Sequence, residues 1–403
     1  MAIGSSRGAG VLADALYRTP NALAPQYSAF RVADRLLLTG HSHQAWPDCA
    51  RHGQLRAWDD AAQLVDQKWE RAFAKADRVR QGFATLLDDA DGEYALASST
   101  HDLLLRFLSA LPLRERPRLV TTDGEFHTIR RQLDRLGEAG LEVAKVAADP
   151  AGTVAERLTA AVDDRTAAVL VSAVFFHNAH IVPGLDGLAA ACARHGAELL
   201  VDSYHALGVV PMSVRAQGLE GAFVTGGGYK YCQLGEGNCF LRIPPGRAFR
   251  PVVTGWFSEF SALAESRPGA VLYGTGADRF AGSTYDPTSH YRAAEVFDFF
   301  EQQGLDPAFL REVSQHQVGR LAERFDALDC DPAVVTRDRT VPLGQIGGFL
   351  ALRAPRAAEL SAALRARGVL TDARGDALRF GPAPYLSDAQ LDDAMAMLSE
   401  VGR

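Results

Sequence analysis

The feature that most restricts the fold of this chain is a series of short apolar runs in which apolar and polar residues do not alternate. Residues 167–174 read AAVLVSAV, and residues 199–201 read LLV. Strands with this composition are buried on both faces of a sheet. Because helical patterns separate the runs, the sequence predicts a mainly parallel sheet that is covered by helices on both sides.

The predicted strands and helices alternate over the middle of the chain. We expect strands at residues 94–97, 118–121, 141–146, 167–174, 198–201 and 221–225, and helices at residues 102–111, 127–136, 154–162 and 185–195. Ligands of such sheets bind beyond the carboxyl ends of the strands. One edge of the sheet should therefore carry residues 98–101, 125–127, 202–205 and 226–230.

The flanking segments suggest three parts: an N-terminal arm at residues 1–30, a large domain at 31–288 and a smaller C-terminal domain at 289–403. Residues 53–87 have a charged helical pattern, with candidate inward positions at Trp58, Leu64, Trp69, Phe73 and Phe83. The C-terminal part predicts helices at 291–303, 357–367 and 388–401, and short strands at 347–352 and 378–380.

Composition argues against several classes of protein. The 403 residues carry a formal charge of −7 and no long run of like charges, so nucleic acid and anionic membranes are not the expected partners. The longest apolar run, 167–176, is too short to span a bilayer. The five scattered cysteines show no metal-binding spacing, and the start MAIGSSRGAG lacks a signal-peptide core. We therefore expect no metal and a cytoplasmic protein.

The segment TGGGYKYCQ contains the first candidate catalytic residue, Lys230. A lysine amine is a nucleophile only when it is deprotonated, which requires burial or a nearby cation. By itself, Lys230 could be a solvated residue of a glycine-rich loop. However, Asp202 ends a predicted buried strand, and His205 follows three residues later. A carboxylate there could hold the protonated ring nitrogen of pyridoxal phosphate, or it could simply cap a helix.

Two further segments fit the same ligand. Ser99 and Thr100 lie between a strand and a helix, where hydroxyls and backbone N–H groups can bind phosphate, although an ordinary helix cap has the same composition. Phe126 could stack on a planar cofactor, with His127 as the second choice. The alternatives are core packing for Phe126 and a helix start for His127.

Five motifs together carry a resemblance to a known family. They are Gly228-Tyr229-Lys230-Tyr231, Asp202-x-x-His205, Gly255-Trp256, Gly282-Ser283-Thr284 and Arg379-Phe380-Gly381-Pro382-Ala383-Pro384-Tyr385. With these motifs in combination, the chain resembles the fold-type I pyridoxal phosphate enzymes of the class V aminotransferase group over residues 30–400, and among them it most resembles kynureninase. The resemblance implies the aspartate aminotransferase-like α/β fold of PLP-dependent transferases, in which a mainly parallel seven-stranded sheet lies between helices and a smaller α+β domain follows.

The resemblance also implies roles for individual residues. Lys230 would bind pyridoxal 5'-phosphate covalently and transfer protons at the substrate α-carbon. The other cofactor contacts would be Asp202 at the ring nitrogen, His205 near the phenolic oxygen or Asp202, Tyr229, Ser99 and Thr100 at the phosphate, and Phe126 on the ring. In a homodimer, Ser283 or Thr284 of the neighbouring subunit would complete the phosphate site. Arg379 would bind the substrate α-carboxylate, and Trp256, His41 and His43 are candidate substrate contacts.

The chain also departs from kynureninases. Gly228 replaces a serine, Gly40-His41-Ser42-His43 replaces a Gly-Asn-Ser element, and Phe257-Ser258-Glu259 follows the Gly-Trp pair. His41 and His43 could bind a polar substrate, act as an acid–base pair or belong to a polar loop. We therefore expect a PLP-dependent lyase or hydrolase that cleaves a bond at the β-carbon of an amino acid other than kynurenine, by hydrolysis or retro-aldol cleavage. The alternative is an aminotransferase or C–S lyase. A cysteine desulfurase is disfavoured because Cys330, the only late cysteine, lacks a glycine-rich mobile loop. A scaffold without catalysis is disfavoured because Lys230 and Asp202 are both present.

Overall fold

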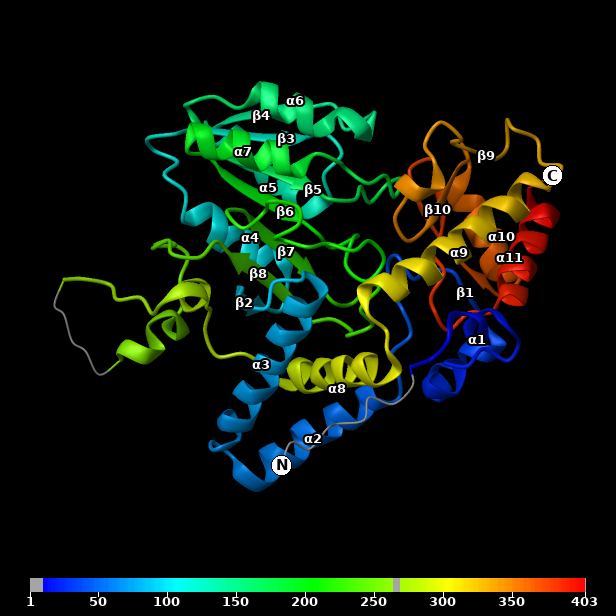
Figure 1. Cartoon of the computed structure of the whole chain (residues 1–403), viewed down its shortest axis with the longest axis horizontal. Helices are drawn as coiled ribbons and strands as arrows, with labels where there is room; N and C mark the ends of the chain where they lie inside the picture. Colours follow the sequence, from blue (N-terminus) through cyan, green and yellow to red (C-terminus); the bar gives the residue numbers. More distant parts are fainter. Residues whose placement is uncertain (1–9, 264–268, 403) are drawn as a thin grey trace.

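A sheet of seven strands forms the centre of the structure (Figure 1), in the order β2-β8-β7-β6-β5-β3-β4. The structure is a computed structural model that describes residues 10–263 and 269–402, so residues 1–9, on which the expectation about a signal peptide depends, lie outside the description. The strand bounds are β2 Glu93–Ala97, β3 Arg118–Thr122, β4 Glu142–Val146, β5 Thr166–Ser172, β6 Glu198–Asp202, β7 Phe223–Gly227 and β8 Cys239–Ile243.

Six of these strands agree with the predicted ones to within a few residues, and the seventh, β8, was not predicted. It lies between β2 and β7 and is antiparallel to both, whereas the other neighbouring pairs are parallel. No helix separates β8 from β7, so the alternation of strands and helices that revealed the other strands is missing here. The residues between β7 and β8 include Lys230, so this hairpin connection carries the lysine.

Helices cover both faces of the sheet (Figure 1). Four of them follow strands, as predicted: α4 Thr100–Ser109, α5 His127–Glu138, α6 Val154–Ala161 and α7 Leu185–His195. The helical pattern over 53–87 corresponds to two helices, α2 Cys49–Leu64 and α3 Lys68–Leu86, and the chain turns between them at Val65 with φ 53°. Phe83 is buried as predicted, but Trp58 is 76% exposed, so its expected inward position is wrong.

The C-terminal part has its own antiparallel sheet, in the order β12-β13-β10-β9. These strands are β9 Thr336–Arg337, β10 Leu350–Arg353, β12 Asp372–Arg374 and β13 Ala377–Phe380, and the helices are α8 Thr288–Gln303, α9 Pro307–Asp326, α10 Ala357–Ala366 and α11 Asp388–Val401. Helix α9 was not predicted. Helix α8 packs against α2 and α3, so it lies beside the N-terminal helices (Figure 1).

The N-terminal segment joins the C-terminal part. After the short helices α1 Ala13–Tyr17, η1 Ala24–Phe30 and η2 Val32–Asp34, strand β1 Leu36–Leu37 pairs in parallel with β11 Val369–Leu370. A further bridge joins Thr39 to Gly381. The domain boundary expected at residue 31 would assign this strand to the large domain, whereas its strand partner belongs to the C-terminal part.

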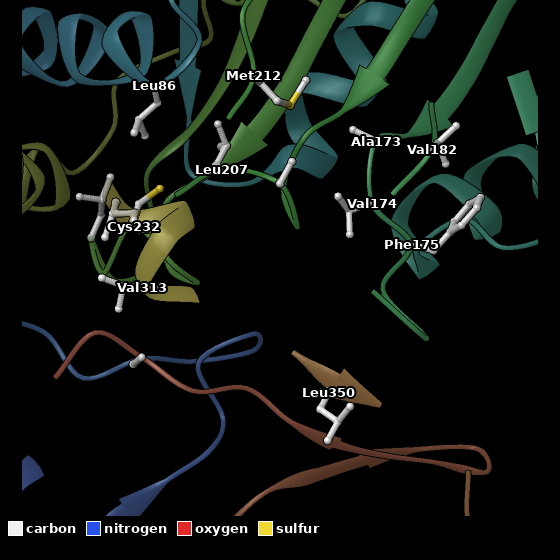
Figure 2. Close-up of a cluster of buried hydrophobic side chains, with 14 of the residues drawn as sticks. Leu86, Ala173, Val174, Phe175, Val182, Leu207, Met212, Cys232, Val313 and Leu350 are labelled. Atoms are coloured by element: carbon white, nitrogen blue, oxygen red, sulfur yellow. The ribbon is translucent and has the colours of Figure 1, made fainter. Parts of the chain in front are cut away.

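One hydrophobic cluster continues from the large sheet into the C-terminal part. Figure 2 shows Val174 and Cys232 on one side and Leu350 of β10 on the other, and all three are buried members of this cluster. Burial of apolar side chains is the main favourable term in folding. The two parts therefore share a core, which fixes the C-terminal strands relative to the sheet edge. Within the described residues no helix is long and apolar enough to cross a membrane.

Candidate active site

A cavity of about 230 Å³ lies at the carboxyl ends of the parallel strands, on the predicted edge of the sheet. Residues from segments far apart in the sequence line it because parallel strands end on the same side. The lining comprises Ser98, Ser99, Thr100, His101, Phe126, Thr128, Ser172, Val174, Phe176, Asp202, Tyr204, His205, Tyr229, Lys230, Glu236, Gly237 and Cys239. The structure thus brings together seven of the site residues predicted from sequence, namely Ser99, Thr100, Phe126, Asp202, His205, Tyr229 and Lys230.

Lys230 is buried just after the end of β7. Its Nζ lies 2.8 Å from Nε2 of His205, which is also buried. Burial lowers the pKa of Lys230 from 10.5 to about 7; the negative charge of Asp202 opposes this shift, and the positive charge of Arg379 adds to it. A substantial fraction of the amine is therefore neutral near pH 7, as a nucleophile or general base requires.

Three aromatic rings surround the Lys230 amine. Its Nζ lies 4.4 Å from the ring centroid of Tyr204, 5.2 Å from that of Phe126 and 5.6 Å from that of Tyr229. Ring faces stabilise a cation, so they partly compensate the protonated amine for its lost water. Sequence reasoning missed Tyr204, although it lies between Asp202 and His205, because no pattern distinguished it from a helix-start residue.

Asp202 ends β6 at the cavity, as predicted. Its Oδ1 accepts a hydrogen bond of 2.9 Å from the backbone N–H of Tyr204. Burial raises the pKa of Asp202, while this hydrogen bond and the charge of Lys230 oppose the shift. A protonated ring nitrogen beside the carboxyl group would also oppose this shift.

A second carboxyl group, Glu125, lies behind the cavity and was not predicted to have a role. It is buried and accepts hydrogen bonds from the hydroxyls of Ser172 at 2.6 Å and Thr122 at 2.7 Å. Burial raises the pKa of Glu125 to about 7, although these hydrogen bonds oppose the shift, and the negative charge of Asp202 contributes. Ser172 pairs with Asp202 across β5 and β6, so Glu125 contacts the strand residue beside Asp202.

The N-terminus of α4 opens on the cavity. Ser99 is the N-cap residue, and its hydroxyl accepts the N–H of Asp102 at 3.2 Å. The expected cap and the expected phosphate site therefore involve the same residues. The free N–H groups of the first turn, together with the helix dipole, favour an anion at this end of the cavity.

The two candidates for the stacking residue differ in their position relative to the cavity. Phe126 precedes α5 and lines the cavity, where its ring packs edge-on against Phe176 with 5.3 Å between centroids. His127 is exposed and is absent from the lining. Phe126 is therefore the candidate whose side chain is placed at the cavity, and its stacking role stays a prediction.

Arg379 and His41 are buried close to each other, outside the lining of this cavity. Asp372, which sequence reasoning missed, joins them: its carboxylate accepts two hydrogen bonds from Arg379 and one from Nε2 of His41. Asp372 and Arg379 are cross-strand partners in the hairpin of β12 and β13, which turns at Gly375 with φ 59°. Gly375 was the sequence signal that could have revealed this pair, because a glycine at a hairpin turn predicts that the residues on either side of it face each other across two strands.

The other predicted substrate and interface residues lie at the surface. His43 is largely exposed, and its ring stacks on Tyr229 with 5.1 Å between centroids. Trp256 is 42% exposed and donates a hydrogen bond from its indole N–H to Thr284 at 3.3 Å. Ser283 and Thr284 line a second cavity, of about 820 Å³, which meets the first at Ser98 and Gly237.

The three glycines before Lys230 make room for protein side chains. A Cβ atom would lie 2.8 Å from Leu207 at Gly226, 2.6 Å from Tyr204 at Gly227 and 2.3 Å from Leu234 at Gly228. The missing side chains at these positions therefore allow close packing against Leu207, Tyr204 and Leu234. The serine that kynureninases have at the last of these positions would collide with Leu234.

Comparisons with known proteins agree with this architecture. The family model of the kynureninase C-terminal domain matches residues 312–398, which include Asp372 and Arg379. The uncharacterized aminotransferase YcbU of Bacillus subtilis (strain 168) is 23% identical over 348 residues, which are 85% of this chain and 88% of that protein.

Solved structures give the same fold. A mutant of C-DES with glycine covalently linked to its PLP cofactor has a TM-score of 0.81 at 15% identity, over 93% of this chain and 98% of that one. The apo cysteine desulfurase of Thermococcus onnurineus NA1 has a TM-score of 0.75 at 16% identity, over 92% and 95% of the two chains. The fold predicted from the sequence is thereby confirmed.

Proposed function

We propose that this chain cleaves a bond at the β-carbon of an amino acid. It is a PLP-dependent enzyme with the fold-type I architecture, and it resembles the class V aminotransferase group. The observation that carries the proposal is the buried Lys230, whose Nζ is 2.8 Å from His205 in the cavity that Asp202 also lines. A buried lysine with a lowered pKa in a cavity that ends at a helix N-terminus is suited to covalent catalysis with an aldehyde cofactor.

The residues of the cavity fit pyridoxal 5'-phosphate. It offers an amine for the aldehyde, a carboxyl group for the ring nitrogen, an aromatic ring for the face of the pyridine, and hydroxyls with free N–H groups for the phosphate. Nδ1 of His205 is buried and has no hydrogen-bond partner among the described residues. A polar ligand group in the cavity could satisfy that atom, because buried polar atoms generally have partners.

The cofactor, when bound, supplies the electron sink that stabilises negative charge at the substrate α-carbon. Lys230 would hold it and, once released, move protons at the α-carbon, with His205 orienting the amine. Asp202 would keep the ring nitrogen protonated, Ser99 and Thr100 would bind the phosphate, and Phe126 would stack on the ring. Arg379 would anchor the α-carboxylate.

Cleavage of a C–C bond, as in kynureninase, is the first candidate because the kynureninase C-terminal domain matches this chain around Arg379. The second candidate is a C–S lyase or aminotransferase, which the structural similarity to C-DES and the likeness to YcbU favour. A persulfide-forming cysteine is not favoured. Cys239 lines the cavity, but burial raises the pKa of its thiol to about 12, so it is not a nucleophile near neutral pH. Cys330 is absent from the lining.

The site also suggests a homodimer. Ser283 and Thr284 line the neighbouring cavity, not the one that contains Lys230. Residues 252–260, which contact Thr284 through the indole N–H of Trp256, expose Val252 and Phe260 along with Trp256, and exposed apolar side chains of this size mark contact surfaces. In a dimer these hydroxyls would reach the phosphate of the other subunit.

The first experiment asks whether the purified protein carries the visible absorbance of a lysine-bound PLP. We expect the band in wild type and in Lys145→Ala, which replaces a surface lysine, and its loss in Lys230→Ala. A wild-type protein that does not take up PLP would contradict the proposal.

The second experiment identifies the products from candidate amino acids. Alanine as co-product indicates cleavage of the kynureninase kind, glycine indicates retro-aldol cleavage, and sulfide indicates C–S cleavage. A 2-oxo acid that appears only with an added amino acceptor indicates transamination, which would overturn the assignment of β-carbon cleavage.

A further inference from the structure

The arginine that should bind the substrate carboxylate already has a counter-ion in the protein. Nε of Arg379 donates to Oδ1 of Asp372 at 2.8 Å, and Nη2 donates to Oδ2 at 2.5 Å. Arg379 is 3% exposed. A buried guanidinium without a counter-ion costs several kcal/mol, so Asp372 stabilises the arginine before any substrate binds.

Some N–H groups of Arg379 remain available to a ligand. A guanidinium has five N–H groups. Asp372 accepts from two of them, and the backbone carbonyl of Phe176 accepts from one on Nη1. Two N–H groups remain, one on each terminal nitrogen. A substrate carboxylate can therefore still form two hydrogen bonds, but it cannot use the edge that Asp372 fills.

The carboxylate of Asp372 is itself held in place. Nε2 of His41 donates to its Oδ1 at 2.8 Å, and the His41 ring packs on Phe349 with 4.6 Å between centroids. Gly381 makes room for His41, because a Cβ there would lie 2.2 Å from Nδ1 of the histidine. Burial alone would raise the pKa of Asp372, but the hydrogen bonds from His41 and Arg379 hold it well below the usual range. Asp372 is therefore ionised at neutral pH.

The protonation state of His41 differs from that of Asp372, because the imidazole is uncharged. Burial lowers its pKa to about 4, although the hydrogen bond to Asp372 opposes this shift, so the ring is neutral near pH 7. The three side chains together then carry one positive and one negative charge, and their net charge is zero. When a ligand carboxylate binds Arg379, the group formed by the ligand and these three side chains has a net negative charge. The ligand carboxylate also lies near the negative charge of Asp372.

We propose that Asp372 is a specificity-determining residue for the substrate carboxylate: it fills one edge of Arg379, neutralises its charge and so weakens the binding of carboxylates. This inference rests on the proposed function of Arg379. It implies that affinity for the substrate comes mainly from groups other than the carboxylate, and that a simple carboxylate is a poor ligand. His41 is a positioning residue that acts through Asp372.

The test removes the charge of Asp372 and keeps the shape of its side chain. In Asp372→Asn, one oxygen can still accept from Arg379, so the arginine stays in place while its charge is released. We expect the PLP-loaded variant to bind L-alanine about tenfold more tightly than wild type, because removing a like charge near the ligand is worth about one power of ten. The cofactor spectrum reports the binding, and L-alaninamide, which lacks the carboxylate, should bind both proteins equally.

Three variants and one cofactor-free measurement complete the test. Asp376→Asn makes the same change at a half-exposed residue of the same hairpin and should leave L-alanine binding unchanged. Arg379→Gln should remove the preference for L-alanine over L-alaninamide in both backgrounds. Acetate should raise the thermal stability of PLP-free Asp372→Asn more than that of wild type. If Asp372→Asn does not fold, Asp372→Ser removes the same charge with a smaller side chain.

The outcomes separate the two proposals. If a folded Asp372→Asn or Asp372→Ser protein binds L-alanine and acetate no more tightly than wild type, Asp372 only orients the arginine and the inference is wrong. If wild type does not take up PLP, the proposed function fails, while the acetate measurement still decides the role of Asp372.

Discussion

The amine of Lys230 and the imidazole of His205 lie 2.8 Å apart, and both side chains are almost completely buried. The two groups therefore share one environment without bulk water. Burial lowers the pKa of Lys230 to about 7 and holds that of His205 well below its ordinary value of 6.5, and the charges of Lys230 and Arg379 contribute to the latter. Near neutral pH the histidine is thus uncharged and can accept a hydrogen bond from the amine.

The lowered pKa predicts how the PLP-free protein takes up its cofactor. Only the neutral amine reacts with an aldehyde, so the uptake rate should increase as pH rises through about 7, not through the ordinary value of 10.5. Stopped-flow absorbance over a series of pH values measures this rate. In Arg379→Gln the midpoint should move to higher pH because a nearby positive charge is lost. A wild-type rate that is still increasing steeply above about pH 9 would contradict the assignment.

Glu125 should make stability depend on pH. Because its folded pKa of about 7 is above the ordinary value of 4.5, the stability that it contributes is fully present below pH 4.5 and is lost as pH rises through 7. Glu125→Gln does not ionise, so the variant should gain on the order of 2 kcal/mol relative to wild type between pH 5 and pH 8. Urea denaturation of the PLP-free proteins measures the difference. Glu156→Gln, at an exposed residue of α6, is the control, and an equal pH response in both variants would refute the prediction.

Gly381 should tolerate no side chain, in contrast to a glycine in open space. A Cβ at Gly381 would lie 2.2 Å from Nδ1 of His41 and 2.7 Å from its backbone nitrogen. We expect Gly381→Ala to lower the free energy of unfolding by about 1–3 kcal/mol. Gly319→Ala lies in helix α9, where a Cβ would meet nothing within 4 Å, so it should raise that free energy by about 0.5–1 kcal/mol. Denaturant titrations measure the free energy of unfolding of both variants. Changes of the same sign in Gly381→Ala and Gly319→Ala would contradict the packing argument.

Mixed dimers test whether subunits share the phosphate site. Lys230→Ala cannot bind PLP covalently, and the double variant Ser283→Ala, Thr284→Ala should bind it weakly. When both proteins are unfolded, mixed and refolded, hybrid dimers should contain one site with Lys230 from one chain and both hydroxyls from the other. We expect the visible absorbance to return in the mixture at PLP concentrations where neither parent shows it. If the mixture only averages its parents, the hydroxyls act within their own chain.

Much of the fold could be predicted because its determinants are local. Apolar runs such as residues 167–174 identified the parallel strands, and α7 and α11 begin and end at the predicted residues. Strand β8 and helix α9 were missed. Strand β8 has no helix before it, and helix α9 directly follows another helix. Neither element therefore belongs to the alternation of strands and helices on which the prediction relied. The break at Val65 was not predicted because a positive φ is unusual for a β-branched residue, so the residue type gave no signal for it.

The sequence by itself determined which chemical groups lie at one end of the sheet. Lys230, Asp202, His205, Ser99 and Phe126 each follow or end a strand, and parallel strands bring their carboxyl ends to the same edge. Only the tertiary structure decided how these groups are charged and paired. The burial that lowers the pKa of Lys230 depends on segments far apart in the chain, and so does the contact between His41 and Asp372, which are 331 residues apart. Desolvation and charge pairing depend on distance in space, which no local pattern of residues encodes.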